Sequence, residues 1–202
     1  MYNRAYEFHK WAQPLLEKCG FKAPPELQLE SGKQYKLALL GFHRDASSLL
    51  YNLTQSDPEL AHETLVVDFN VALLLAISQT GATVKYGDLA NQETLHHLGL
   101  NRCQVIVCTI PDDLLRGIDN RSLVHVVREM APQAVIIANA IVIDEVHAVY
   151  EAGADYVYLN RFEAAWTLQR AIRAGIDKQI DMFRTERQSR NHYRPDRKEI
   201  LS

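Results

Sequence analysis

The apolar segment 36–40 leads directly into a turn that begins at Gly41, and a helical pattern and a second strand ending at Asp68 follow. This order is typical of the first strand, helix and strand of a nucleotide-binding unit, whose turn has the pattern G-x-G-x-x-G. Gly41 supplies the tight bend, and Ala46 nearly satisfies the close packing that the third glycine allows. His43 replaces the second glycine, which normally lets the backbone approach a pyrophosphate. The layout therefore predicts a nucleotide-binding ancestry with an altered turn.

Strands and helices alternate along the rest of the chain. Segment 105–109 is an unbroken apolar run, as expected for a central parallel strand buried on both faces. Helices between successive strands favour right-handed crossovers, and hence an α/β fold. We expect a Rossmann-like, doubly wound parallel sheet in the order 3-2-1-4-5-6 with helices on both faces. The predicted strands are 35–40, 64–68, 83–86, 105–109, 134–138 and 156–159, and the predicted helices are 45–55, 70–79, one ending at Leu98, 115–130, 141–152 and 161–184.

The two ends of the chain differ from this central domain, which we place at residues 35–184. Residues 1–34 combine an aromatic-rich helical pattern with a linker that contains Pro24, Pro25 and Gly32. We predict an amphipathic N-terminal helix there, and a further segment before it. Residues 185–202 are charged and nearly free of apolar side chains, which is typical of a disordered tail.

Composition narrows the function classes. The chain has 202 residues, which suits one α/β domain with extensions, and a formal net charge of -3, which argues against a nucleic-acid partner. Cys19, Cys103 and Cys108 have neither disulfide nor metal spacing, so we interpret them as buried thiols. No run approaches the ~20 apolar residues of a membrane span, which predicts a soluble chain. We expect no metal site.

Candidate binding residues follow the strands of the predicted sheet. In a doubly wound sheet, ligands bind at the carboxyl ends of the strands where the strand order reverses. Asp68 can accept hydrogen bonds from ribose hydroxyls or cap the next helix, and Asp88 can contact a ligand or act as a helix N-cap. His43 and Arg44 can donate to one phosphate at a helix N-terminus, or fill a dead site. We expect the turn at 42–45, Asp68 and Asp88 to converge on one hollow shaped for an adenosine-type molecule.

Three stretches carry a more specific resemblance. They are 84–90 (VKYGDLA), 94–100 (TLHHLGL) and 105–112 (VIVCTIPD), and together they resemble the TrkA-N or RCK (regulator of K+ conductance) domain. The nearest variety is the one in the C-terminal region of Kef-type monovalent cation:proton antiporters. Residues 2–6 and 11–15 are similar to the segment through which those antiporters leave their last transmembrane helix. The resemblance extends to about Asp177.

This resemblance implies a non-catalytic, cytosolic regulatory domain of a potassium or other monovalent cation:proton antiporter at an inner membrane. Such domains form homodimers and bind adenine nucleotides, and the antiporter's membrane domain would precede residue 1. Since His43 hinders a pyrophosphate, AMP or another adenine nucleotide is favoured over NAD(H), and a site without a ligand stays open. The implied cofactor-binding residues are Gly41, Phe42, His43, Arg44, Asp45, Asp68, Phe69, Gly87, Asp88, Leu89, Thr109, Ile110 and Pro111.

Two other classes share parts of this pattern. An NAD-dependent oxidoreductase would use the same opening unit, but the only Tyr-x-x-x-Lys spacing is Tyr6 to Lys10, upstream of the first strand. A phosphoreceiver-like signalling domain would end on a strand similar to 151–156. That fold needs a lysine after its fifth strand, where this chain has Asn160 and Arg161.

Overall fold

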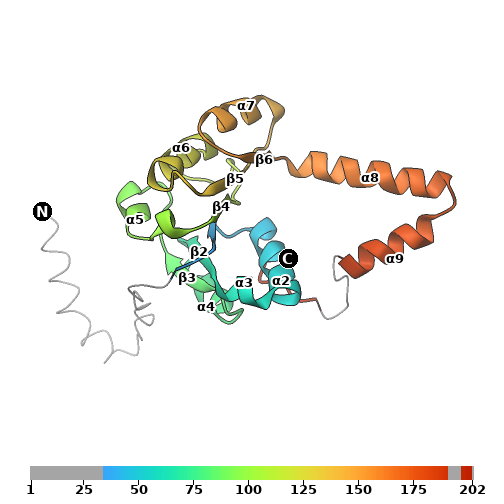
Figure 1. Ribbon diagram of the computed structural model, residues 1–202, viewed down its shortest axis with the longest axis horizontal. Helices are drawn as coiled ribbons and strands as arrows, with labels where there is room; N and C mark the ends of the chain where they lie inside the picture. The colour runs from blue at the N-terminus through green and yellow to red at the C-terminus, as the bar shows by residue number, and fades with distance from the viewer. Residues whose placement is uncertain (1–33, 191–196, 202) are drawn as a thin grey trace, which may run out of the picture. The chain divides into compact units, whose positions relative to one another are not determined.

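The computed structural model describes residues 34–190 and 197–201 (Figure 1). The predicted N-terminal helix and linker therefore lie outside the described residues, except for Gln34. The same holds for Cys19 and for Tyr6 and Lys10.

A six-stranded parallel sheet forms the centre of the domain. Its order is β3-β2-β1-β4-β5-β6, which confirms the predicted order 3-2-1-4-5-6. The strands β1 and β2 are buried along their whole length, because helices cover both faces of the sheet. The strand bounds are Leu37–Leu40 for β1, Thr64–Asp68 for β2, Thr83–Tyr86 for β3, Val105–Cys108 for β4, Val135–Asn139 for β5 and Tyr156–Tyr158 for β6.

Helices and one 3-10 turn connect the strands. Alternate residues of each strand point to opposite faces, so Leu39 and Val66 join one core cluster, while Leu40 and Val67 join the other. The first cluster includes residues of α2 and α4, and the second includes residues of α5, α6 and α7. The bounds are Arg44–Ser56 for α2, Pro58–His62 for α3, Val71–Ser78 for α4, Gln92–His96 for α5, Leu100–Arg102 for the 3-10 turn η1, Asn120–Met130 for α6, Ile143–Glu151 for α7, Asn160–Ile176 for α8 and Ile180–Arg190 for α9.

Three helix predictions need correction. Residues 57 and 58 do not only break the chain: Asp57 caps the short helix α3 by accepting a hydrogen bond from the Leu60 amide. Helix α6 begins at Asn120 and not at residue 115, because Gly117 has a φ of 76° and Asp119 is the N-cap. The predicted helix 161–184 is two helices, since Lys178 takes a left-handed φ of 56° between α8 and α9.

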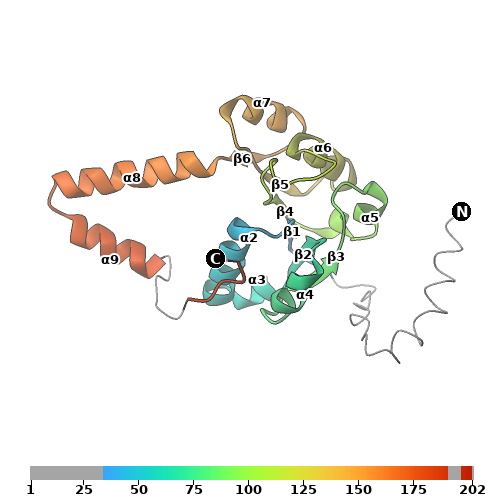
Figure 2. The same cartoon turned by 180° about the vertical axis from the view of Figure 1, so that it is seen from behind.

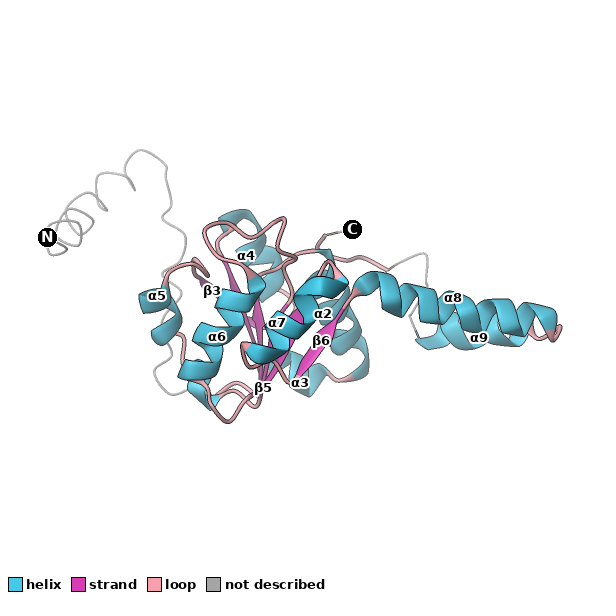
Figure 3. Cartoon of the chain, turned by 90° about the horizontal axis from the view of Figure 1, so that it is seen from above, coloured by secondary structure: helices cyan, strands magenta, loops and turns pink. Residues whose placement is uncertain are grey.

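The C-terminal residues differ from the predicted disordered tail. Helix α9 continues to Arg190. Helices α8 and α9 contact each other and extend beyond the edge of the sheet (Figure 3), and they diverge from the turn that joins them (Figure 1). Residues 197–201 lie beside α2, as Figures 1 and 2 both show, and Ile200 and Leu201 pack against the core cluster on that face. These apolar side chains, together with hydrogen bonds to α2, keep the segment on the domain.

The two described cysteines confirm the interpretation as buried thiols. Cys103 and Cys108 are free and buried. Burial disfavours the thiolate, and it raises the pKa of Cys103 to about 11 and that of Cys108 to about 12. Both side chains therefore stay protonated at neutral pH and serve as packing groups.

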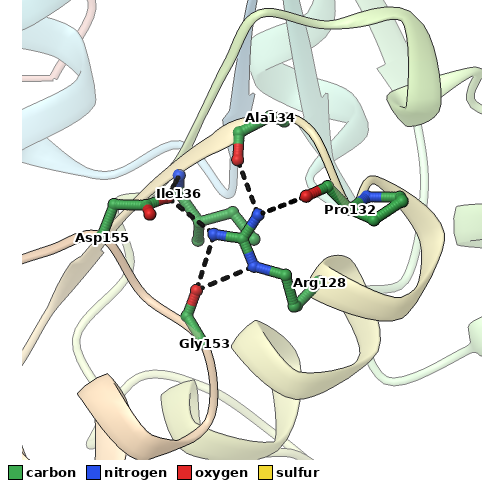
Figure 4. Close-up of polar contacts among 6 residues, drawn as sticks. All are labelled: Arg128, Pro132, Ala134, Ile136, Gly153 and Asp155. Carbon is green, nitrogen blue, oxygen red and sulfur yellow. Dashed lines mark hydrogen bonds and ion pairs between the residues drawn. The ribbon is translucent and has the colours of Figure 1, made fainter.

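Arg128 fastens the last turn of α6 to the β5 and β6 side of the sheet (Figure 4). Its guanidinium donates hydrogen bonds to the carbonyl oxygens of Gly153, Pro132 and Ala134. It also lies 2.6 Å from Asp155 Oδ2, which accepts a hydrogen bond from the Ile136 amide. The pKa of Asp155 is lowered, mainly by the Ile136 amide and also by Arg128. One side chain thus satisfies three carbonyl groups from two loop segments, the α6–β5 loop and the α7–β6 loop.

We expect Arg128→Ala to lower the free energy of unfolding by about 2–3 kcal/mol, because it leaves several partly buried carbonyl groups without a donor. Arg128→Lys should recover only part of this loss, since an ammonium cannot reproduce the planar fork of donors. Urea denaturation followed by circular dichroism measures both. Arg121→Ala, on an exposed face of the same helix, is the control. Equal stability of Arg128→Ala and this control would contradict the role assigned to Arg128.

Candidate functional site

The site lies where the strand order reverses, between the adjacent strands β1 and β4. The chain leaves β1 at Gly41, whose φ of 82° is a left-handed conformation that favours glycine. A Cβ atom at this position would lie 2.2 Å from the Ile110 side chain. Gly41 therefore makes the predicted bend, and its space is closed by the loop that follows β4.

Thr109 joins the two neighbouring strand ends. Its backbone amide donates to the Leu40 carbonyl, and its hydroxyl donates to the Gly41 carbonyl at 2.8 Å. Thr109 is almost completely buried. The Thr109 side chain therefore stabilises the turn by a buried hydrogen bond, and it does not face solvent.

Asp68 connects the end of β2 to this turn. One carboxylate oxygen accepts a hydrogen bond from the Phe42 amide at 2.6 Å, and the other accepts one from the Asn70 amide at 2.7 Å. Burial raises the pKa of Asp68, and these two hydrogen bonds oppose that rise. Asp68 does not act as the helix cap, because the N-cap of α4 is Asn70, whose side chain accepts from the Ala72 amide. Each carboxylate oxygen still has a second lone pair for a ligand.

The N-terminus of α2 opens beside Asp68. His43 is the N-cap, in extended conformation, and its side chain makes no capping hydrogen bond to the described residues. The first helical hydrogen bond runs from the Ser47 amide to the His43 carbonyl, so the amides of the first turn have no partner within the helix. Together with the helix dipole, these groups favour an anion at this end.

Two adjoining hollows lie at this edge of the sheet, and we call them together the switch-point cleft. The first has a volume of about 440 Å³, and the second about 210 Å³. Both are lined by the same four residues, Phe69, Ile110, Leu114 and Arg116. Phe42, His43, Arg44 and Asp68 line the first hollow, and Asp88 and Leu89 line the second.

This geometry modifies the expectation of a single hollow. Asp68 and Asp88 face neighbouring hollows that share a wall. Asp88 is exposed and accepts a hydrogen bond from the Ala90 amide. The N-cap of α5 is Asn91, so the cap interpretation of Asp88 is wrong. The carboxylate of Asp88 therefore stays accessible at the rim.

Four of the other predicted residues lie behind the cleft lining and do not line it themselves. Gly41 and Thr109 form the turn, and the Gly87 amide donates a hydrogen bond to the Asp68 carbonyl. The Pro111 carbonyl accepts hydrogen bonds from the amides of Leu114 and Leu115.

Asp45 points elsewhere: its carboxylate accepts a hydrogen bond at 2.6 Å from Asn160, the first residue of α8.

Sequence reasoning missed several residues of the cleft. Arg116 lines both hollows, but the predicted helix 115–130 hid it within a regular element. Its position in a loop after the strand end, next to Gly117, was the available signal. Leu201 lines the first hollow although it lies far away in the sequence, and no local pattern indicates this. The remaining missed residues are Asn70, Leu73, Tyr86, Leu114 and Leu115.

Comparison with known proteins identifies the family. The TrkA-N domain model matches residues 37–160, which include all six strands and the switch-point cleft except Leu201. The chain belongs to the TrkA-N domain family. This confirms the resemblance inferred from the three sequence stretches. No curated protein matches the chain significantly.

Solved structures share the fold of this TrkA-N domain. The TrkA-N domain of the inner membrane protein YbaL from Escherichia coli is 26% identical, with a TM-score of 0.58, and the match covers 68% of this chain and 96% of that one. The Kef CTD of Shewanella denitrificans, in an AMP-bound form, is 19% identical, with a TM-score of 0.51 and coverage of 77% and 94%. The GsuK channel bound to NAD is 22% identical, with a TM-score of 0.55, and the match covers 76% of this chain and 26% of that one.

Two kinds of feature are absent from residues 34–190 and 197–201. No helix there has both the length and the apolar character needed to cross a membrane. No cluster of three or more histidine, cysteine or acidic side chains in the same residues has a geometry suited to a metal ion.

We expect Asp68→Ala to destabilise the domain by about 2–3 kcal/mol, because it leaves the buried Phe42 amide without an acceptor. Asp88→Ala removes a carboxylate of the same cleft but only one exposed hydrogen bond, so it should cost about 0.5–1 kcal/mol. Thermal unfolding of both variants by calorimetry tests the difference. Similar losses in the two variants would show that Asp68 does not hold the turn.

Proposed function

We propose that this TrkA-N domain is a non-catalytic, nucleotide-sensing regulatory domain of a membrane-bound cation transport protein. The favoured transport protein is a monovalent cation:proton antiporter, whose membrane part would precede residue 1, with this domain on the cytoplasmic side of an inner membrane. The family and the description of YbaL as an inner membrane protein support this proposal. The RCK domain of the GsuK channel has the same fold.

One observation carries the proposal: the N-terminus of α2, which has no side-chain cap, and the buried Asp68 line the same hollow. The amides at the start of α2, with His43 and Arg44, suit a phosphate group. Asp68 lies in the same hollow and can accept ribose hydroxyl hydrogens. The adjoining hollow has an apolar wall that includes Leu89 and Leu115, and it suits an adenine ring with Asp88 at the rim.

We propose AMP as the favoured ligand over NAD(H). His43 lines the hollow, and in the sequence it replaces the second glycine of the pattern, which lets the backbone approach a pyrophosphate. Side-chain donors from His43 and Arg44 can replace that approach for a single phosphate. The Kef CTD, GsuK bound to ADP and GsuK bound to NAD show that similar folds accept adenine nucleotides of different size.

Isothermal titration calorimetry with AMP, ADP, ATP and NADH tests the nucleotide site. We expect AMP to bind, and Arg44→Ala to weaken it about tenfold, because a charge-assisted hydrogen bond to phosphate is lost. His43→Gly should improve NADH binding about tenfold relative to AMP, since glycine restores the backbone approach and is tolerated at an N-cap.

Arg102→Ala is the matched control for charge. Arg102 is exposed in η1, which precedes β4 and so lies at the opposite edge of the sheet. If none of the four nucleotides produced binding heat, the nucleotide-sensing proposal would be overturned. The remaining role for the domain would then be a structural one in assembly.

We further propose that the domain forms a homodimer through α8 and α9. Helix α8 buries none of its residues within the described chain, although several of its side chains are large and apolar. An exposed apolar surface of this extent is typical of a protein–protein interface. Its members are Phe162, Trp166, Leu168, Ile172 and Ile176 on α8, and Ile180 and Met182 on α9.

The double variant Leu168→Asp with Ile172→Asp should be monomeric, because charges on this surface oppose apolar burial. Size-exclusion chromatography with light scattering measures the mass of this variant and of the original chain. Leu75→Asp is the control, since Leu75 is similarly exposed but lies on α4. A monomeric original chain, or a dimer that survives the double variant, would contradict this interface.

A further inference from the structure

The C-terminal segment 197–201 is docked along α2 by specific contacts. Glu199 accepts a hydrogen bond from the Ser48 hydroxyl at 2.7 Å, and the Leu201 amide donates to the Ser47 hydroxyl at 2.9 Å. These contacts lie on the first two turns of α2. The segment therefore ends beside the helix N-terminus that we assign to a phosphate.

Arg197 fixes the other end of the segment. Its guanidinium forms an ion pair with Glu199, and both side chains are largely shielded from solvent. It also donates to the Asn52 side chain at 3.1 Å and lies 4.3 Å from the centre of the Tyr51 ring. Residue 197 thus lies near residues 51 and 52, and residue 201 near residue 47, so the segment runs along α2 toward its first turn.

Leu201 brings this segment into the switch-point cleft. It lines the first hollow together with His43 and Arg44. An isobutyl group at this position offers no hydrogen bond to a phosphate. A phosphate that used the same helix end would have to share the space with Leu201 or displace it.

We propose that residues 197–201 form a removable cover of the nucleotide site, which competes with the phosphate group of the ligand. This inference rests on the proposed nucleotide-sensing function. Only the fraction of molecules with the cover released is competent to bind, so the cover weakens the apparent affinity by that fraction. Release of the segment on binding would also convert occupancy of the cleft into a change on the surface of α2.

Calorimetric titration of AMP into the intact chain and into a variant lacking residues 197–202 tests the cover. We expect the deletion to tighten AMP binding about fivefold, which corresponds to a cover that is docked in about four-fifths of the molecules. Glu199→Ala should also tighten AMP binding, because this substitution removes the contacts with Ser48 and Arg197 that hold the cover in place. Lys198→Ala is the matched control, because Lys198 is exposed within the same segment. The affinity of this variant for AMP should equal that of the intact chain.

A second measurement follows the cover itself. Saturating AMP should accelerate deuterium uptake in a C-terminal peptide that contains Leu201, because the hydrogen bond from its amide to Ser47 is broken. Circular dichroism checks that each variant is folded, and Glu199→Ala provides the answer if the deletion does not fold.

The outcomes separate the two proposals. Unchanged AMP affinity in the deletion and in Glu199→Ala would overturn the cover while leaving the nucleotide site intact. Weaker binding by the deletion would overturn competition too, because residues 197–201 would then belong to the binding site. Absence of AMP binding in every variant would overturn the nucleotide function, and the cover would be overturned with it.

Discussion

The switch-point cleft depends on the carboxylate of Asp68. Its two oxygens accept hydrogen bonds from the Phe42 amide after β1 and from the Asn70 amide before α4. Two loops that leave neighbouring parallel strands are thereby held by one side chain. Burial makes the ionised form costly and raises the pKa of Asp68, and the amide donors offset part of this cost. The wall of the first hollow is thus held by a buried side chain that also lines this hollow.

Another part of the wall of the first hollow depends on the close contact between the ends of β1 and β4. Gly41 can approach Ile110 because it lacks a Cβ atom, and the Thr109 hydroxyl fastens the Gly41 carbonyl. These contacts direct the chain from β1 into α2 with the helix N-terminus toward the cleft. The altered residue, His43, is placed at this corner by the same bend. The replacement of the second glycine therefore retains the path of the backbone and brings a histidine to the wall of the first hollow.

Much of the fold could be predicted from local pattern. The pattern predicts strands at 64–68 and 83–86, and the structure gives the same bounds. The sheet order follows from the alternation of strands and helices. The break between α8 and α9 was missed because it depends on the left-handed backbone of Lys178, and lysine carries no local signal for that conformation. The apolar residues before Asp119 predict a start of α6 at residue 115, but the Asp119 side chain caps the helix, which therefore begins at Asn120.

The sequence by itself determined the βαβ units, the parallel sheet and the set of polar residues at its carboxyl edge, because these follow from periodicity and from neighbours a few positions apart. Only the tertiary structure decided how those residues are used. It directed Asp45 toward Asn160, brought Arg116 into both hollows, and laid Glu199 on Ser48, 151 positions away. Contacts across such separations arise from the packing of whole elements, which no local pattern encodes.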